Sequence, residues 1–361
     1  MSLGSSEGLA EASRRMSTGS AKIGLLAPEA DTRWDDYVDL HPQASLYHKT
    51  AWRDLIQSVF GHESIYLFAQ GEEGMNGVLP LIRLKSRLFG DYIVSMPYFN
   101  YGGPLSSTPA LSLLLMEAAA EKARALGCSH AEFRETGARE IWAERKDKVV
   151  MELSLPGDAD ALWTSFGPKL RAQIRKPLKE GAEFIQGGSE LLPEFYSVFS
   201  RNMRDLGTPV YPIVFFEEIV TRFPEHASIV LVRYRRKAVA AGFLLGYRKR
   251  LEIPWASSLR EYNSLGVNML LYSETLRLAI EKKYDTFDFG RSSIGGGTYN
   301  FKKQWGATEK QLFWHYWLSK GGAPPQLNPA NPKYRLAISL WRRLPLFVAN
   351  RVGPLIVRSL P

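Results

Sequence analysis

The chain has 361 residues, of which 45% are hydrophobic and 23% charged, the composition of a soluble globular protein long enough for two domains. Its formal net charge of +9 suits an anionic partner such as RNA, a nucleotide-linked substrate or a phospholipid surface, and equally a generically basic protein. The single cysteine, Cys128, excludes an internal disulfide and a thiolate-rich metal site, and we expect it to be buried.

The first twenty residues are small and polar, and we expect residues 1–20 to form a disordered tail. They lack the apolar core of a secretory signal. No apolar run elsewhere approaches the length needed to cross a bilayer. The expected compartment is therefore the cytoplasm, and the basic end of the chain raises the inner face of the cell membrane as a more specific location.

Residues 21–158 are predicted to form a first α/β domain. Its strand signals come as a hairpin around the turn sequence GEEGM, and a third strand could extend that sheet. A loop rich in proline and glycine, PYFNYGGP, precedes an apolar-periodic helix that Gly127 ends. The predicted elements are strands at 64–70, 76–84 and 91–96, a helix at roughly 109–126 and a strand at 129–135.

Residues 159–320 are predicted to repeat this order in a second domain. Moving the first half forward by 156 residues places 116–134 on 272–290, so that helix, break and strand coincide without a gap. Two matching units of three strands, a helix and a strand indicate a duplicated α/β domain. The elements of the second unit are strands at 228–234, 238–247 and 250–257, a helix at 265–283 and a strand at 284–290.

A basic segment at 160–184 joins the two halves and has an apolar helical stripe. Arg171 and Arg175 are four residues apart on one helical face, where they could clamp an anionic acceptor group. The alternative is a generic basic face that contributes only to solubility. Pro177 indicates a kink or a break in this helix. Two further helices are expected at 190–206 and 213–222.

The tail, residues 321–361, begins with a linker rich in proline, glycine and asparagine at 321–332. In the basic segment 333–361 that follows, apolar residues alternate with arginines, and Pro345 and Pro354 are expected to break any long helix. This segment either packs back on the body of the protein or lies as a basic amphipathic piece on an anionic membrane.

The segment DFGRSSIGGGTYNFKKQWGA, residues 288–307, is the most informative stretch of the chain. Its glycines resemble a phosphate cradle only weakly, because the lysine spacing of a P-loop is missing. No G-x-S-x-G elbow and no dinucleotide-binding glycine fingerprint stands elsewhere. The six histidines are scattered without a His-x-x-x-His spacing, so no metal site is expected.

The order of hairpin, helix and strand resembles that of Gcn5-related (GNAT) acyltransferases, which hold the pyrophosphate of acyl-CoA at a helix start. The matching stretch, Arg260–Gly266, has asparagine in place of the first glycine of that loop, and its spacing differs. Over roughly 40–320 the chain resembles the FemAB family. The resemblance lies in the repeated α/β unit, the basic segment LRAQIRKPLKEG and residues 288–307. The FemAB-like proteins associated with exosortase/PEP-CTERM systems are the most similar subgroup, also in the tail NPKYRLAISLWRRLP.

This resemblance implies an α/β fold with mixed sheets, built as two tandem GNAT-like acyltransferase domains. It also implies transfer of an aminoacyl or acyl group from an activated ester to an amine, without a cofactor, a metal or a covalent enzyme intermediate. Positive charge and the altered CoA loop favour aminoacyl-tRNA as donor, and acyl-CoA or acyl carrier protein are alternatives. The implied acceptor belongs to cell-envelope or exopolysaccharide synthesis. The alternative function is a catalytically inactive scaffold that binds RNA or an anionic membrane.

The resemblance places Phe301 and Lys302 at the reaction centre. An ammonium group there would stabilise the oxyanion of ester aminolysis or neutralise a donor phosphate, and the alternative is a solvated helix lysine. Asp288 would orient the attacking amine or act as its base, or else cap the glycine loop. Arg291 would bind phosphate or pair with Asp288.

Further candidates for substrate binding are aromatic or polar. Tyr299 suits base stacking, although such aromatic residues more often belong to a core. The resemblance implies that the loop carrying Tyr98, Asn100 and Tyr101 helps to hold the acceptor, and a turn that packs its own tyrosines is the competing explanation. Trp255 would line the cleft or fill a core.

Overall fold

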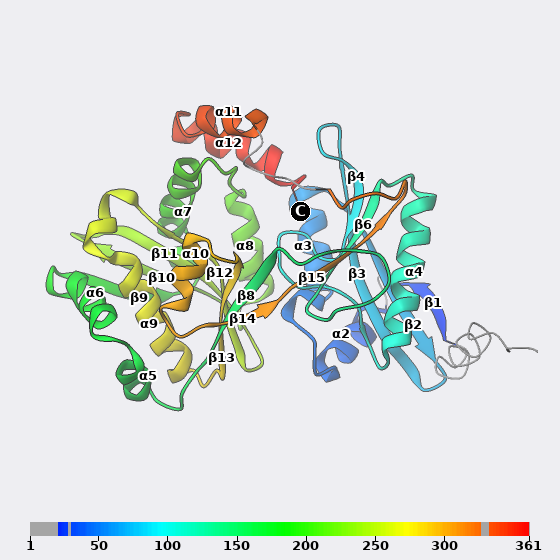
Figure 1. The fold of residues 1–361 in the computed structure, drawn as a ribbon, viewed down its shortest axis with the longest axis horizontal. Coiled ribbons are helices and arrows are strands. Elements are labelled where there is room, and N and C mark those ends of the chain that lie inside the picture. The colour runs from blue at the N-terminus through cyan, green and yellow to red at the C-terminus, as the bar shows by residue number, and fades with distance from the viewer. Residues whose placement is uncertain (1–20, 28–29, 326–331, 361) are drawn as a thin grey trace, which may run out of the picture. The chain divides into compact units, whose positions relative to one another are not determined.

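The computed structural model describes residues 21–27, 30–325 and 332–360 (Figure 1). The chain forms two compact units, each with its own mixed sheet. The expected disordered tail at residues 1–20 lies outside the described residues. Unit 1 comprises Met1–Arg145, Leu312–Pro324 and Ser359–Pro361, and unit 2 comprises Lys146–Gln311 and Pro325–Arg358.

The sheet of unit 1 is built around the predicted hairpin, and helix α4 packs on it. Thr108 caps α4 by accepting a hydrogen bond from the Leu111 amide, and Gly127 follows its end with φ of 71°. Cys128 is buried in this core, as expected. In sheet order the strands are β1 (Lys22–Leu25), β2 (Glu63–Gly71), β3 (Gly74–Ser86), β4 (Gly90–Val94), β6 (His130–Glu135), β15 (Phe313–Leu318) and β7 (Ala143–Arg145), and β5 (Leu105–Ser106) pairs with β3. The helices are α2 (Asp31–Leu40), α3 (Ala51–Phe60) and α4 (Pro109–Ala125).

The sheet of unit 2 is covered on both faces. Phe243 and Leu244 are neighbours in one strand, so their side chains point to opposite faces. Phe243 packs against aromatic residues of α7 and α8, whereas Leu244 belongs to the core that includes α9. In sheet order the strands are β14 (Thr308–Gln311), β8 (Lys148–Ser154), β13 (Thr286–Ser293), β12 (Arg250–Ser258), β11 (Lys237–Tyr247), β10 (Ala227–Tyr234) and β9 (Ala182–Gly187). The helices are α5 (Ala159–Ser165), α6 (Pro168–Lys179), α7 (Leu192–Leu206), α8 (Ile213–Arg222), α9 (Val267–Glu281), α10 (Gly297–Lys303), α11 (Pro332–Trp341) and α12 (Leu346–Val357).

The two units share the order predicted from the repeat. Each has an antiparallel hairpin, a third strand, a crossover helix and a strand that returns parallel to the third one. The parallel pairs are β4 with β6 and β12 with β13. The duplicated α/β architecture is therefore confirmed.

The chain path differs from the predicted division at residue 158. Strand β8 precedes that boundary but pairs with β13 in unit 2, and β15 lies after the boundary but pairs with β6 in unit 1. Each unit thus uses a strand from the far side of the boundary. These two antiparallel pairs join residues far apart in sequence, so local strand signals do not show which sheet either strand joins.

Two prolines expected to break helices lie inside them instead. Pro177 is within α6, which continues to Lys179, and Pro354 is within α12, which continues to Val357. Each proline removes the one hydrogen bond that its N–H would donate, and each helix ends within three residues of its proline. Pro345, in contrast, immediately precedes α12 as expected. No helix within the described ranges is long and apolar enough to cross a bilayer.

Candidate functional site

Three carboxylates lie in one row across the sheet of unit 2. Strands β12 and β13 pair in parallel over three positions, of which the last joins Glu252 to Asp288. On its other side Asp288 is the partner of Glu152 in β8. Directly paired residues face the same side of a sheet. Because Leu251 and Phe287 next to them belong to the core with α9, the three carboxylates face away from α9.

The row marks the point where two parallel strands separate. Beyond Glu252 and Asp288, β12 continues to Ser258 and β13 to Ser293, and in the described part of the chain they no longer pair with each other. Strand separation leaves backbone groups and side chains available to a ligand. It is therefore the natural place in unit 2 to look for a site.

Asp288 is completely buried, and two groups satisfy its carboxylate. Arg250 Nη1 donates to Asp288 Oδ2 at 3.0 Å and also to Glu152 Oε1 at 2.8 Å. The Gly290 amide donates to Asp288 Oδ1 at 2.7 Å. A buried carboxylate is stable only when it is paired and hydrogen-bonded. Asp288 therefore holds together the local backbone and the Arg250 side chain.

Lys302 of α10 lies beside this row and is only 7% exposed. Its Nζ donates to the Gly290 and Arg291 carbonyls, both at 2.9 Å. Successive carbonyls of a regular strand point to opposite sides, but Gly290 has φ of 76° and the strand register shifts here. The bulge turns both carbonyls toward the ammonium. An ammonium has three N–H groups, and among the described residues the third has no acceptor.

The pKa of Lys302 is low for a lysine. Burial lowers it from its ordinary value of 10.5 to about 8. The negative charge of Asp288 opposes this shift, the positive charge of Arg291 adds to it, and Glu252 opposes it again. A group with a pKa near the working pH can both donate a proton and take one back. Lys302 is therefore suited to acid–base chemistry as well as to charge stabilisation.

Stability is expected to rise with pH because of Lys302. The unfolded chain keeps the Lys302 proton up to a pKa of 10.5, whereas the folded chain releases it above about 8, so the unfolded state binds more protons in this window. Between about pH 7.5 and about pH 9.5, the free energy of unfolding of the wild type should gain about 2 kcal/mol over that of Lys302→Met. Urea unfolding at the two pH values measures this gain.

The exposed neighbour Lys303 provides the control. Lys303→Met removes the same charge from the same helix and should follow the pH dependence of the wild type. Parallel curves for the wild type and Lys302→Met would show that burial does not perturb Lys302.

The remaining predicted residues of 288–307 have different surroundings. Phe301 packs edge-on against Tyr272, with ring centroids 5.0 Å apart. Tyr299 is buried in the core, and the Lys303 ammonium lies 5.5 Å from its ring centre. The Arg291 side chain is exposed, while its carbonyl binds Lys302. The structure thus brings Asp288, Arg291 and Lys302 together and places Tyr299 in the core.

Other predicted residues of unit 2 lie elsewhere. Trp255 is 8% exposed and packs edge-on against Phe215 and Phe216 in the aromatic core. On α6, Arg171 is half-buried, and the Arg175 guanidinium lies 5.0 Å from the centre of the Trp163 ring. Neither arginine belongs to the carboxylate row.

The predicted acceptor loop belongs to unit 1. Tyr98 has φ of 74°, packs against Phe60 and lies with its hydroxyl 3.1 Å from His62 Nε2. Asn100 and Tyr101 are half-buried in the same loop. At Tyr98 the turn therefore packs its own tyrosine.

Glu152, Arg250 and Glu252 were not among the residues predicted from the sequence. A signal for two of them exists in RLEIPWAS, where Arg250 and Glu252 alternate with buried apolar residues of a strand. Charged residues are rarely buried unless they are paired, so such an alternation indicates a buried charge cluster. Among the described residues, no group of three or more His, Cys, Asp or Glu side chains is arranged to hold a metal ion.

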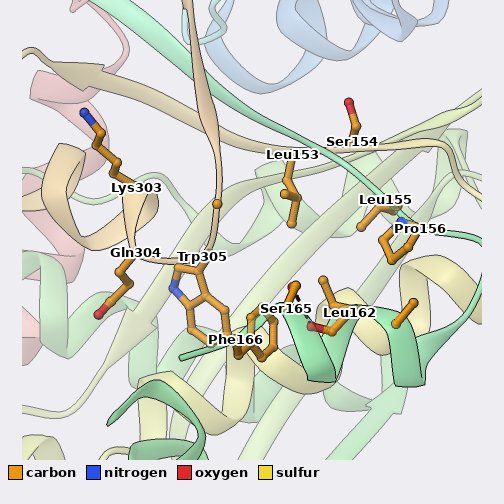
Figure 2. A pocket seen from close by; sticks show the side chains of 12 residues that line it. Leu153, Ser154, Leu155, Pro156, Leu162, Ser165, Phe166, Lys303, Gln304 and Trp305 are labelled. Atoms are coloured by element: carbon orange, nitrogen blue, oxygen red, sulfur yellow. Dashed lines mark hydrogen bonds between the residues drawn. The ribbon is translucent and has the colours of Figure 1, made fainter. Parts of the chain in front are cut away.

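A cavity of about 530 Å³ lies elsewhere in unit 2, between α5 and the end of α10 (Figure 2). Trp305 and Phe166 meet edge-on in its wall, and Figure 2 shows Leu155 and Pro156 beyond them. Asp288 and Lys302 do not line it. The cavity and the carboxylate row are therefore separate features.

The segment that carries the row is similar to a known family. Residues 168–303 match the family described as acetyltransferase (GNAT) domain, and this range includes Arg250, Asp288 and Lys302. This match covers less than half of the chain. Over 144 residues the chain is 24% identical to UDP-N-acetylmuramoylpentapeptide-lysine N(6)-alanyltransferase of Weissella viridescens. This match covers 39% of the chain and 43% of that protein, so the chain spans less than half the length of this curated relative.

Solved structures extend the likeness to most of the chain. The crystal structure of FemX has a TM-score of 0.60 at 16% identity, covering 81% of this chain and 96% of FemX. L-PGS from Bacillus licheniformis has a TM-score of 0.52 at 15% identity, covering 88% of this chain and 98% of L-PGS. A tandem GNAT protein from the clavulanic acid biosynthesis pathway has a TM-score of 0.51 at 9% identity, covering 85% of this chain and 100% of that protein. The predicted fold of two GNAT-like domains, similar to FemAB proteins, is confirmed. The exosortase/PEP-CTERM association stays a prediction.

Proposed function

We propose that the protein is a FemAB-like N-acyltransferase, which moves an aminoacyl or acyl group from an activated ester to an amine. The observation that carries the proposal is the buried Lys302 ammonium, held where β12 and β13 of the GNAT domain separate. The FemX-like fold and the alanyltransferase relative support the same reaction class.

In this reaction the amine nitrogen bonds to the ester carbonyl carbon and the carbon–oxygen bond to the donor breaks. The amine loses a proton and the departing oxygen gains one. The tetrahedral intermediate carries an oxyanion, which a preorganised N–H donor stabilises strongly in a buried site. We assign this role to the third N–H of Lys302. Its pKa of about 8 also allows it to protonate the departing oxygen and to take up the proton that the amine loses.

Asp288 is assigned a positioning role rather than that of a base. Both of its oxygens already accept hydrogen bonds, from Gly290 and from Arg250. By fixing the Gly290 bulge, Asp288 sets the two carbonyls that orient Lys302. This arrangement supports charge stabilisation by Lys302 as the main chemical contribution of the site.

Aminoacyl-tRNA is the proposed donor, with acyl-CoA or acyl carrier protein as alternatives. The net charge of +9 supports a polyanionic donor. In addition, the loop Arg260–Leu265 that would hold the CoA pyrophosphate is a 3-10 turn, and Lys176 Nζ donates to its Ser264 carbonyl at 2.7 Å. The proposed acceptor is an amine of a cell-envelope or exopolysaccharide precursor, used in the cytoplasm.

A donor screen tests this function. The protein is incubated with labelled aminoacyl-tRNA, acyl-CoA and acyl carrier protein pools, with amino-sugar and lysine-peptide acceptors present or absent. We expect one donor class to be consumed only with an acceptor, and Lys302→Met to bind that donor but turn it over slowly. Failure to bind or consume any donor would contradict the enzyme proposal and favour the inactive scaffold.

A further inference from the structure

Helices α11 and α12 expose an unusual number of large apolar side chains. The described residues include twelve large exposed hydrophobic side chains, and five of them belong to these two short helices. Exposed apolar residues gathered in one place mark an interaction surface, whereas scattered ones do not. The five are Leu336 (65% exposed), Leu340 (56%), Phe347 (75%), Val352 (37%) and Leu355 (66%).

The opposite side of these helices is anchored to α7 and the loop that follows it (Figure 1). Ala349, Gly353 and Val357 recur every four residues of α12 and are buried. A side chain at Gly353 would place its Cβ only 2.8 Å from the Val210 amide nitrogen. Arg204 Nη1 also donates to the Leu344 carbonyl at 2.9 Å. The exposed side is therefore a fixed outward surface of unit 2.

The charged side chains of this segment have one sign. Between residues 332 and 360 the sequence has no aspartate or glutamate. A second copy of the chain would present the same positive charge, so repulsion opposes face-to-face pairing. Anionic lipid headgroups supply the complementary charge, and the acyl region accepts apolar side chains. The exposed arginines are Arg335, Arg342, Arg343, Arg351 and Arg358.

We infer that the outward surface of α11 and α12 binds an anionic phospholipid surface. The helices have 10 and 12 residues, too short to cross a bilayer, so they lie in the plane of the interface. Leu336, Phe347 and Leu355 enter the boundary between headgroups and acyl chains, and the arginines contact the phosphates.

Vesicle sedimentation of the full chain tests this inference without an activity assay. Vesicles of phosphatidylcholine with phosphatidylglycerol are compared with vesicles of phosphatidylcholine alone. The wild type should bind only the anionic vesicles and should be released as salt rises. Phe347→Ser with Leu355→Ser should weaken the partition about tenfold or more, because two large apolar groups are lost from the interface. Arg335→Gln with Arg351→Gln should weaken it and reduce its salt dependence.

Arg87→Gln with Leu88→Ser is the matched control. These two residues lie in the turn between β3 and β4 in unit 1, where Leu88 is 85% exposed. The control variant should bind vesicles as the wild type does. Circular dichroism checks that each variant is folded. Unchanged binding of the α11–α12 variants would overturn the inference, as would a wild type that fails to bind anionic vesicles. If the wild type dimerises and Phe347→Ser with Leu355→Ser abolishes the dimer, the surface binds a second copy of the chain instead.

Discussion

Lys302→Met is expected to lower the turnover of acyl transfer by about 10²- to 10³-fold, the loss typical of removing one oxyanion donor. Donor affinity should change much less, because the proposed bond forms only when charge develops on the ester oxygen. Single-turnover kinetics with the donor found in the screen separates the two quantities. Lys303→Met, one residue away and exposed, should keep nearly the activity of the wild type.

The pH profile gives this prediction a second readout. Because the pKa of Lys302 is about 8, its ammonium form declines above that pH. The ratio of wild-type to Lys302→Met activity should therefore fall as pH rises through about 8. A fully active Lys302→Met protein, or a ratio that does not vary with pH, would remove Lys302 from the chemical step.

Arg250→Met is expected to reduce the free energy of unfolding by about 3–5 kcal/mol, the cost typical of leaving a buried charge without its partner. Asp288 is completely buried, and Arg250 is the cation that contacts it at 3.0 Å. Glu152, the second partner of Arg250, is partly exposed and can be hydrated, so it contributes less to the loss. Urea unfolding at neutral pH measures the effect.

A double-mutant cycle identifies the origin of this loss. Asp288→Asn removes the buried charge but keeps an oxygen that can accept from the Gly290 amide. The double variant Arg250→Met with Asp288→Asn should therefore be more stable than Arg250→Met alone. If the losses in free energy of unfolding of the two single variants simply add in the double variant, the effect of Arg250→Met arises from packing and not from the Asp288 charge.

Local signals predicted the elements of the repeated unit well. Helix α8 has the predicted bounds, 213–222, and both hairpins form where turn residues separate two apolar runs. These features depend on neighbours in the sequence. Lys302 was also predicted, because the resemblance of residues 288–307 to the FemAB family implies its role, and Asp288 was predicted in the same segment.

Long-range pairing explains what the sequence could not reveal. Arg250 and Glu152 are 98 residues apart, and only the register of β12, β13 and β8 brings them together. The strand at 313–318 was missed for the same reason, because its partner β6 lies far earlier in the chain. Burial of Tyr299 and Trp255 likewise depends on helices from other parts of unit 2.

The exchange of strands between the two units has a consequence for synthesis on the ribosome. Strand β6 lies beside β15 in the finished sheet. The ribosome synthesises β15 only after Lys146–Gln311, the larger segment of unit 2. Strand β7 pairs with β15 as well, so it has no sheet to join until then. Unit 1 therefore cannot finish folding cotranslationally before unit 2 emerges, unlike domains that fold in order from the N-terminus. A fragment ending near residue 158 would expose the edge of β6, and its aggregation during expression would be the practical sign of this dependence.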